Sequence, residues 1–137
     1  MKVNIKFNKS QLRDLKRAFM KSPTMVEMEA QNFLARANKN LLSTIKNNPW
    51  EIGQRGGGAP VRTGRLRKHH RSRVDDMRLS ITPMVSEKDP NYADFVHGGT
   101  RRMEARPWLD YAVKTNERKI KVLGNEMLNN LVKKLAR

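Results

Sequence analysis

The most constraining feature of the sequence is a long stripe of apolar residues that recurs at helical spacing. The spacings are i, i+4, i+7 and i+8 over about five turns, which is typical of one face of an amphipathic α-helix. The stripe contains Val26, Ala30, Phe33, Leu34, Ala37, Leu41 and Ile45. We expect the helix to end before Pro49, because proline lacks a backbone donor and disfavours helical geometry in the preceding residue. An apolar face of this length requires other elements to cover it.

A second long helix is predicted from Pro107 onward, and a shorter one near the start of the chain. The apolar face of the long helix would contain Trp108, Ala112, Ile120, Leu123, Met127, Leu131 and Leu135. The shorter helix is indicated by apolar residues at helical spacing, namely Leu12, Leu15 and Phe19. These two helices are candidates to pack against the central one.

Two short strands are predicted by strict alternation of apolar and polar residues. The apolar positions are Val3, Ile5 and Phe7 in the first strand and Met77, Leu79 and Ile81 in the second. Together the elements predict an α+β fold, in which a small antiparallel sheet packs against a long central helix and a long C-terminal helix. A chain of 137 residues has the size of one domain, so we assign residues 1–137 to a single domain.

The segment 49–65, PWEIGQRGGGAPVRTGR, has no periodicity and is predicted to be an extended loop. Its three consecutive glycines carry no side chains to pack. Long loops without secondary structure inside compact domains are commonly functional. We expect a flexible arm that becomes ordered against a neighbouring chain, with Trp50 and Ile52 as its apolar anchors.

The charge balance favours anionic partners. Lys and Arg number 29 against 13 Asp and Glu, which leaves a net charge of +16 and biases the surface toward polyanions or acidic proteins. The segment RTGRLRKHHRSR concentrates this charge in Arg62, Arg65, Arg67, Lys68, Arg71 and Arg73. These side chains could neutralise nucleic-acid phosphates, hold acidic side chains of another subunit, or form a solvated basic edge. The residues alone leave these three interpretations open.

No catalytic, metal-binding or cofactor-binding site is predicted. The absence of cysteine excludes disulfides, thiolate metal sites and cysteine nucleophiles. His69 and His70 are adjacent, so they lack the i, i+4 spacing with which two imidazoles on one helix share a metal. The glycine-rich loop has Ala59 and Pro60 where a phosphate-binding loop requires Lys and Ser or Thr. We therefore expect neither an enzyme nor a cofactor site, and no run of about 18 apolar residues predicts a membrane span.

Residues 92–112, YADFVHGGTRRMEARPWLDYA, combine two adjacent glycines, three arginines and a proline, which is an unusually specific composition for a connecting segment. The two glycines permit positive φ, and Pro107 suits the first turn of a helix. Together with PVRTGRLR at 60–67, the segment resembles the tail-completion, or neck, proteins of long-tailed bacteriophages. The resemblance depends on Thr63, Gly64, Leu66 and Arg67, followed by Tyr92, Ala93, Val96, Gly99, Thr100, Met103, Ala105, Arg106, Pro107, Trp108 and Leu109.

The resemblance implies a non-enzymatic structural protein of the virion, assembled in the host cytoplasm as a homo-oligomeric ring of roughly six or twelve copies. Its partners would be the head connector, adaptor or stopper on one side and the tail terminator or tail tube on the other, with packaged DNA as a further contact. The expected interface residues are Trp50, Ile52, Thr63, Gly64, Leu66, Arg67, His97, Gly99, Thr100, Arg101, Arg102, Met103 and Arg106. The chain departs from the family pattern at Arg62, His97, Gly98, Asp110 and Tyr111, which affects the chemistry facing its partners.

The alternative comes from a different class of function. A free, basic nucleic-acid-binding protein could use the segment 62–73 as its contact. Such a protein would be a monomer that binds duplex DNA, whereas a neck protein would form a defined ring.

Overall fold

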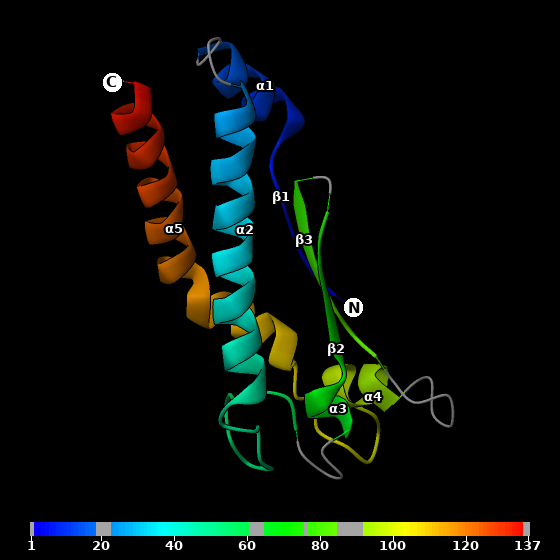
Figure 1. The fold of residues 1–137 in the computed structure, drawn as a ribbon. Coiled ribbons are helices and arrows are strands. Elements are labelled where there is room, and N and C mark those ends of the chain that lie inside the picture. Colours follow the sequence, from blue (N-terminus) through cyan, green and yellow to red (C-terminus); the bar gives the residue numbers. More distant parts are fainter. Residues whose placement is uncertain (1, 19–22, 61–64, 76, 85–91, 136–137) are drawn as a thin grey trace.

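The computed structural model describes residues 2–18, 23–60, 65–75, 77–84 and 92–135. The elements in chain order are β1 (Val3–Lys6), α1 (Lys9–Ala18), α2 (Pro23–Lys46), α3 (Arg65–Lys68), β2 (His70–Asp75), β3 (Arg78–Pro83), α4 (Tyr92–Gly98) and α5 (Trp108–Leu135). Helix α2 is central, with the sheet along one side and α5 along another (Figure 1). The predicted α+β fold, with a small antiparallel sheet and two long helices, is confirmed.

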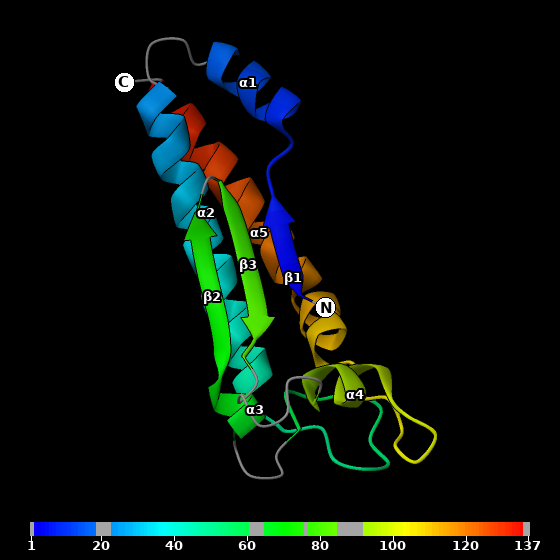
Figure 2. The same cartoon turned by 90° about the vertical axis from the view of Figure 1, so that its right-hand side faces the viewer.

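The sheet has the strand order β1-β3-β2, and both pairings are antiparallel. Side chains alternate between the two faces of a strand, so Leu79 and Ile81 of the middle strand point the same way. Both are fully buried, and Val3 of β1 lies opposite Ile81. Figure 2 shows the sheet in front of α2 and α5, so helices cover one face of the sheet and leave the other open.

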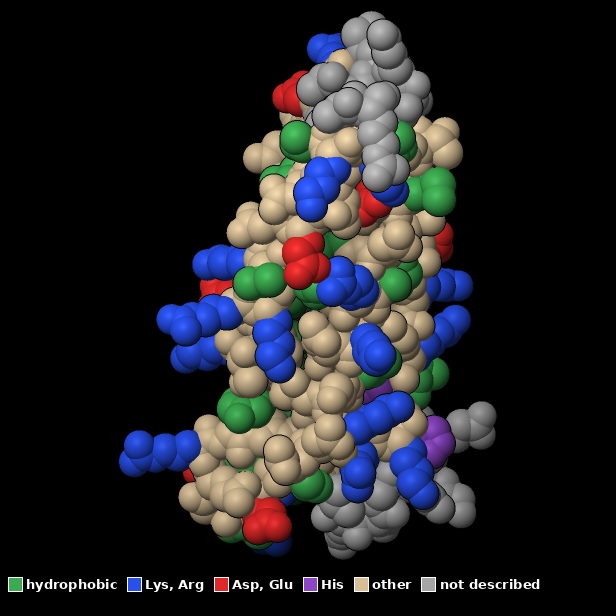
Figure 3. Space-filling model, turned by 60° about the vertical axis from the view of Figure 1, so that its left-hand side comes forward, with side chains coloured by type: hydrophobic (Ala, Val, Ile, Leu, Met, Phe, Trp, Pro, Cys, Tyr) green, Lys and Arg blue, Asp and Glu red, His purple; other side chains and the backbone are tan. Residues whose placement is uncertain are grey.

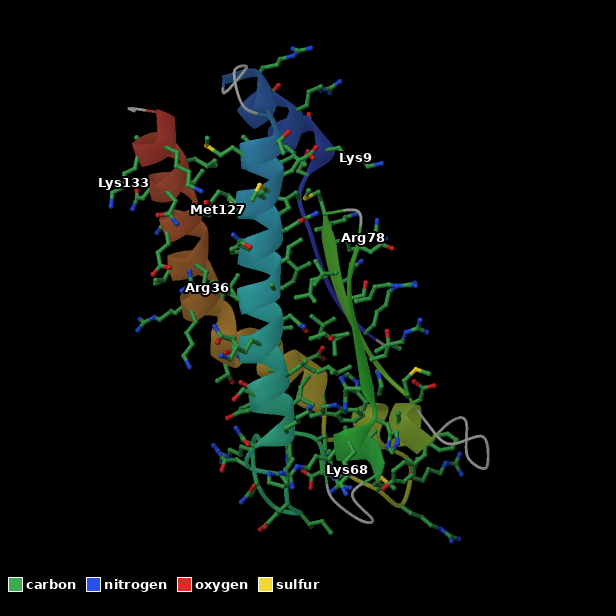
Figure 4. The ribbon with its side chains drawn as sticks, viewed as in Figure 1. Lys9, Arg36, Lys68, Arg78, Met127 and Lys133 are labelled. Carbon is green, nitrogen blue, oxygen red and sulfur yellow. The ribbon has the colours of Figure 1, made fainter. Side chains whose placement is uncertain are left out.

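The core follows the predicted helical stripes. Near the C-terminal end of α2, Leu41 and Ile45 are fully buried in one cluster with Trp108 and Ala112 of α5. Near its N-terminal end, Val26 and Ala30 form a second cluster with Met127 and Leu131. Figure 4 shows Met127 between the two helices. Each large side chain buried in this way contributes about 1.5–3 kcal/mol relative to its exposed state.

Helix α2 ends at Lys46, before the predicted break. Asn48 has a positive φ of 49°, an uncommon conformation in which asparagine is enriched, and Pro49 follows it. From this point the chain turns back along the end of α2. The amide nitrogen of Ala59 donates to the carbonyl of Ile45 (2.8 Å), and that of Gly58 donates to the carbonyl of Asn48 (2.8 Å).

The prediction of a free arm is wrong for residues 49–60, because this part of the loop packs on its own chain. Trp50 is only 9% exposed and belongs to the main core, so it is not an anchor that waits for a neighbour. A Cβ atom at Gly58 would lie 2.4 Å from the carbonyl oxygen of Asn47, so this glycine permits close backbone approach. Arg62, Thr63 and Gly64 lie outside the described residues.

Candidate interaction surfaces

The junction of α4 with α5 is built around Trp108, whose side chain is fully buried. Its Nε1 donates a hydrogen bond to Nε2 of His70 over 2.9 Å, and the ring of His97 packs against it with centroids 5.3 Å apart. An indole nitrogen can only donate, so Nε2 of His70 must be unprotonated. Burial lowers the pKa of His70 to about 4. His70 is therefore neutral at pH 7.

The turn that follows α4 is tightly specified. Gly99 has a φ of 76°, and a Cβ atom there would lie 2.8 Å from the amide nitrogen of Ala105. Thr100 and Met103 exchange two backbone hydrogen bonds, of 2.8 and 3.3 Å. The two residues between them form the exposed tip of this turn, which we call the arginine tip, and they are Arg101 and Arg102.

Arg106 connects this turn to the loop that follows α2. Its guanidinium donates to the carbonyl oxygen of Trp50 (3.3 Å), and its amide nitrogen donates to the carbonyl of Val96 (2.9 Å). The ring of Trp50 in turn packs on Tyr111 of α5, with centroids 5.8 Å apart. The motif residue Arg106 thus holds two loops of its own chain together.

The structure divides the predicted interface residues into two groups. The residues that contribute to the fold of their own chain are Trp50, Leu66, His97, Gly99, Met103 and Arg106. Among them Leu66 is only 5% exposed and lies in the main core, which corrects its assignment to a subunit interface. The exposed residues are Ile52, Arg67, Thr100, Arg101 and Arg102.

The face of the sheet that is turned away from α2 is polar and cationic. Arg71 and Arg73 of β2 lie opposite Thr82 and Ser80 of β3, and alternation places these four side chains on the open face. Three further charged residues share this outer sheet face by register, namely Lys6, Arg78 and Asp75. Figure 4 shows Arg78 on the side of the sheet away from α2. Lys6 and Arg78 were not predicted as site residues from the sequence, although the alternation in the two predicted strands was a signal that could have located them.

The remaining positive charge is widely distributed. Arg67 and Lys68 of α3 are exposed, and with Lys46 they line a depression of about 280 Å³. Figure 3 shows further Lys and Arg side chains spread over the face to which α2 and α5 contribute. Arg62 and the side chain of Arg65 lie outside the described part of the chain. The basic character is thus a property of several faces and is not confined to residues 62–73.

Neither a metal cluster nor a membrane-spanning helix is found within the described ranges. No three His, Asp or Glu side chains there are grouped so as to hold a metal ion. No described helix has an apolar stretch long enough to cross a membrane.

No protein-family model, curated protein or solved structure matches the chain. The described residues offer three candidate surfaces, namely the arginine tip, the exposed Ile52 loop and the outer sheet face.

Proposed function

We propose that this chain is a structural virion protein of a tailed bacteriophage, which forms a ring in the neck and joins the head connector to the tail tube. The observation that carries the proposal is that the two segments of the family resemblance meet. Leu66 of the first segment lies in the same core as Val96 and Trp108 of the second, and His70 accepts the hydrogen bond of Trp108. The two short motifs pack against each other in the folded chain. This is more consistent with a shared family architecture than with chance similarity.

The chemistry of the exposed motif residues supports an assembly role. The hydrogen bonds between Thr100 and Met103 and the conformation of Gly99 hold the arginine tip in one geometry. An arginine on a turn whose backbone is fixed can form bidentate hydrogen bonds with carboxylates without further ordering of the backbone. The partner that suits this tip is an acidic surface on a neighbouring protein of the neck.

Mass measurement by light scattering at low and high salt tests the proposal. A neck protein is expected to give one defined ring, of roughly six or twelve copies, that persists at high salt. Mixing with the tail tube or head connector protein of the same genome should give a stable complex. A monomer under all of these conditions contradicts the proposal.

The outer sheet face supports a second candidate function, which is non-specific binding of nucleic acid. Its four cations, Lys6, Arg71, Arg73 and Arg78, stand on one uncovered surface with Asp75 as their acidic neighbour. Cations that neutralise phosphates release counterions, so log affinity falls with log salt by about 0.9 per neutralised phosphate. This candidate would also fit a ring whose sheets face the DNA passage.

Duplex binding measured at several salt concentrations tests this second candidate. Replacing Arg71, Arg73 and Arg78 with glutamine is expected to reduce the salt slope by roughly 0.9 for each phosphate that is no longer neutralised. Replacing the exposed Lys119, Lys121 and Lys133 of α5 with glutamine removes the same number of charges and is the matched control, and the slope should change less. Equal effects of the two sets mean that the sheet face is not a specific site for DNA.

A further inference from the structure

The loop after α2 presents one isoleucine almost completely to solvent. Ile52 is 88% exposed, the highest value among the large exposed hydrophobic residues in the described ranges. Single exposed apolar residues are common on protein surfaces and need no explanation by themselves. What distinguishes Ile52 is the rigid turn that carries it.

Three hydrogen bonds hold that turn. The amide nitrogen of Gln54 donates to the carbonyl of Glu51 (3.1 Å), and the amide nitrogen of Glu51 donates to Oε1 of Gln54 (3.3 Å). Nε1 of the buried Trp50 donates to the carbonyl of Gln54 (2.9 Å). Gly53 has a φ of 88°, as the third position of a type II turn requires. Because the turn is already ordered, little conformational entropy remains to be lost if Ile52 enters a partner.

The same chain carries an apolar groove that lies apart from this loop. The groove has a volume of about 570 Å³, and its apolar lining comes from Ile5 of β1 and from Val113 and Ile120 of α5. Val113 is 39% exposed. Figures 1 and 2 both show β1 well away from the loop at the end of α2. The isoleucine and the groove are thus two separate patches.

Each of the two patches is flanked by charges of both signs. The turn carries Glu51 before Ile52 and Arg55 shortly after it, and both are exposed. The groove is bordered by Lys114 and Lys121 and by the carboxylates of Asp110 and Glu117. A loop with one charge of each sign therefore meets a rim with both signs, which favours one orientation of contact and disfavours others.

We propose that Ile52 of one copy inserts into the groove of Ile5, Val113 and Ile120 on a second copy. The occupant is this chain itself, and the contact runs head to tail because the two patches differ. A heterologous contact of this kind closes into a ring when the rotation between copies permits it. The inference rests on the proposed ring and adds to it the residues that join neighbouring subunits.

Crosslinking between two single-cysteine variants tests the contact directly. The chain has no cysteine of its own, so Ile52→Cys and Val113→Cys each introduce one thiol. The two variants carry tags of different mass, are mixed, and are treated with a short thiol-to-thiol crosslinker. The expected product is the mixed dimer, in excess over either dimer of identical chains. The control pairs Ile52→Cys with Val132→Cys, a position on α5 that is 60% exposed and outside the groove.

The outcomes separate this contact from the proposed function. If rings form but the mixed dimer is no more abundant than in the control, the proposed contact is wrong and the proposed ring is not contradicted. Chains that remain monomeric overturn both, and assembly that stops at two copies overturns the head-to-tail arrangement.

A substitution gives an independent measurement. Ile52→Asp is expected to weaken self-association by about tenfold or more, because it removes a buried apolar side chain from the contact. The melting temperature measured at concentrations where the chain is monomeric should stay unchanged, since Ile52 is exposed within its own chain. Self-association that is as strong as in the unmodified protein overturns the proposal.

Discussion

Nε1 of Trp108 and Nε2 of His70 are joined by a hydrogen bond of 2.9 Å, which links the first residue of α5 to the first residue of β2. The bond requires an unprotonated imidazole nitrogen, because the indole has no acceptor to offer. His97 packs on the same indole from α4. Strand β2 and helices α4 and α5 are thus held together by one aromatic side chain.

Acidification from about pH 6.5 to pH 4 is expected to lower the free energy of unfolding. Burial lowers the pKa of His70 from 6.5 to about 4, so within this window the unfolded chain binds the proton and the folded chain does not. This contribution to stability is fully present above pH 6.5 and is lost as the pH falls toward 4. Burial also lowers the pKa of His97, which adds to the effect, although Asp110 opposes it. Urea unfolding at pH 7 and pH 5 measures the difference.

Carboxylates also affect acid stability, so the histidine is isolated with His70→Gln. The glutamine oxygen can still accept the Trp108 hydrogen bond and does not titrate. The variant should lose less stability than the unmodified protein between pH 7 and pH 5. An equal loss in both proteins shows that His70 is not responsible.

Gly99→Ala is expected to destabilise the chain by about 1–3 kcal/mol, because a non-glycine residue would be held at positive φ. The new Cβ would also lie 2.8 Å from the amide nitrogen of Ala105. Gly98→Ala is the matched control, since a Cβ there meets nothing within 4 Å. Denaturant titration of both variants compares them. Equal stability of the two would mean that the turn is less constrained than its geometry indicates.

Trp108→Ala should cost about 3–5 kcal/mol, which is the usual range for the removal of a large buried aromatic side chain. The side chain is fully buried, and its loss would also leave Nε2 of His70 without its donor. Val122→Ala, at a position 55% exposed on the same helix, should change stability by no more than about 0.5 kcal/mol. Thermal melts of both variants give the comparison, and similar melting temperatures would contradict a central role of the indole.

Lys134→Ala is expected to cost about 1–3 kcal/mol, because it leaves a carboxylate with little access to water unpaired. Nζ of Lys134 lies 2.6 Å from Oε1 of Glu29, whose side chain is only 9% exposed. The neighbouring, exposed Lys133 is the control, and Lys133→Ala should be close to neutral. If the two alanine variants unfold at the same urea concentration, the pair between α5 and α2 contributes little.

The elements with a clear side-chain period were predicted from the sequence. The stripes that run from Val26 and from Trp108 located α2 and α5, and the alternation around Ile5 and Ile81 located β1 and β3. Strand β2 was missed because Val74 is its only large aliphatic residue, so its alternation carries no hydrophobic signal. It forms through backbone pairing with β3, which only the tertiary fold supplies. Helix α4 is seven residues long and shows too little of a period to be recognised.

The interface residues were harder to predict for a different reason. A tryptophan or leucine in an irregular segment gives no indication of which chain will bury it. Trp50 and Leu66 were assigned to a partner, but the loop turns back and the core of the same chain takes both. Ile52, two residues after Trp50, remains exposed. The periodicity of apolar residues distinguishes buried from exposed positions only within a helix or a strand.

Electron microscopy of the particles that form with and without this protein tests the central claim most directly. The measurement requires the genome that encodes the chain, with and without a stop codon early in this gene. A protein that completes the neck is expected to leave heads and tails as separate particles when it is absent. Supplying the protein from a plasmid should restore joined particles. Joined, infectious particles in the absence of the protein would contradict the account.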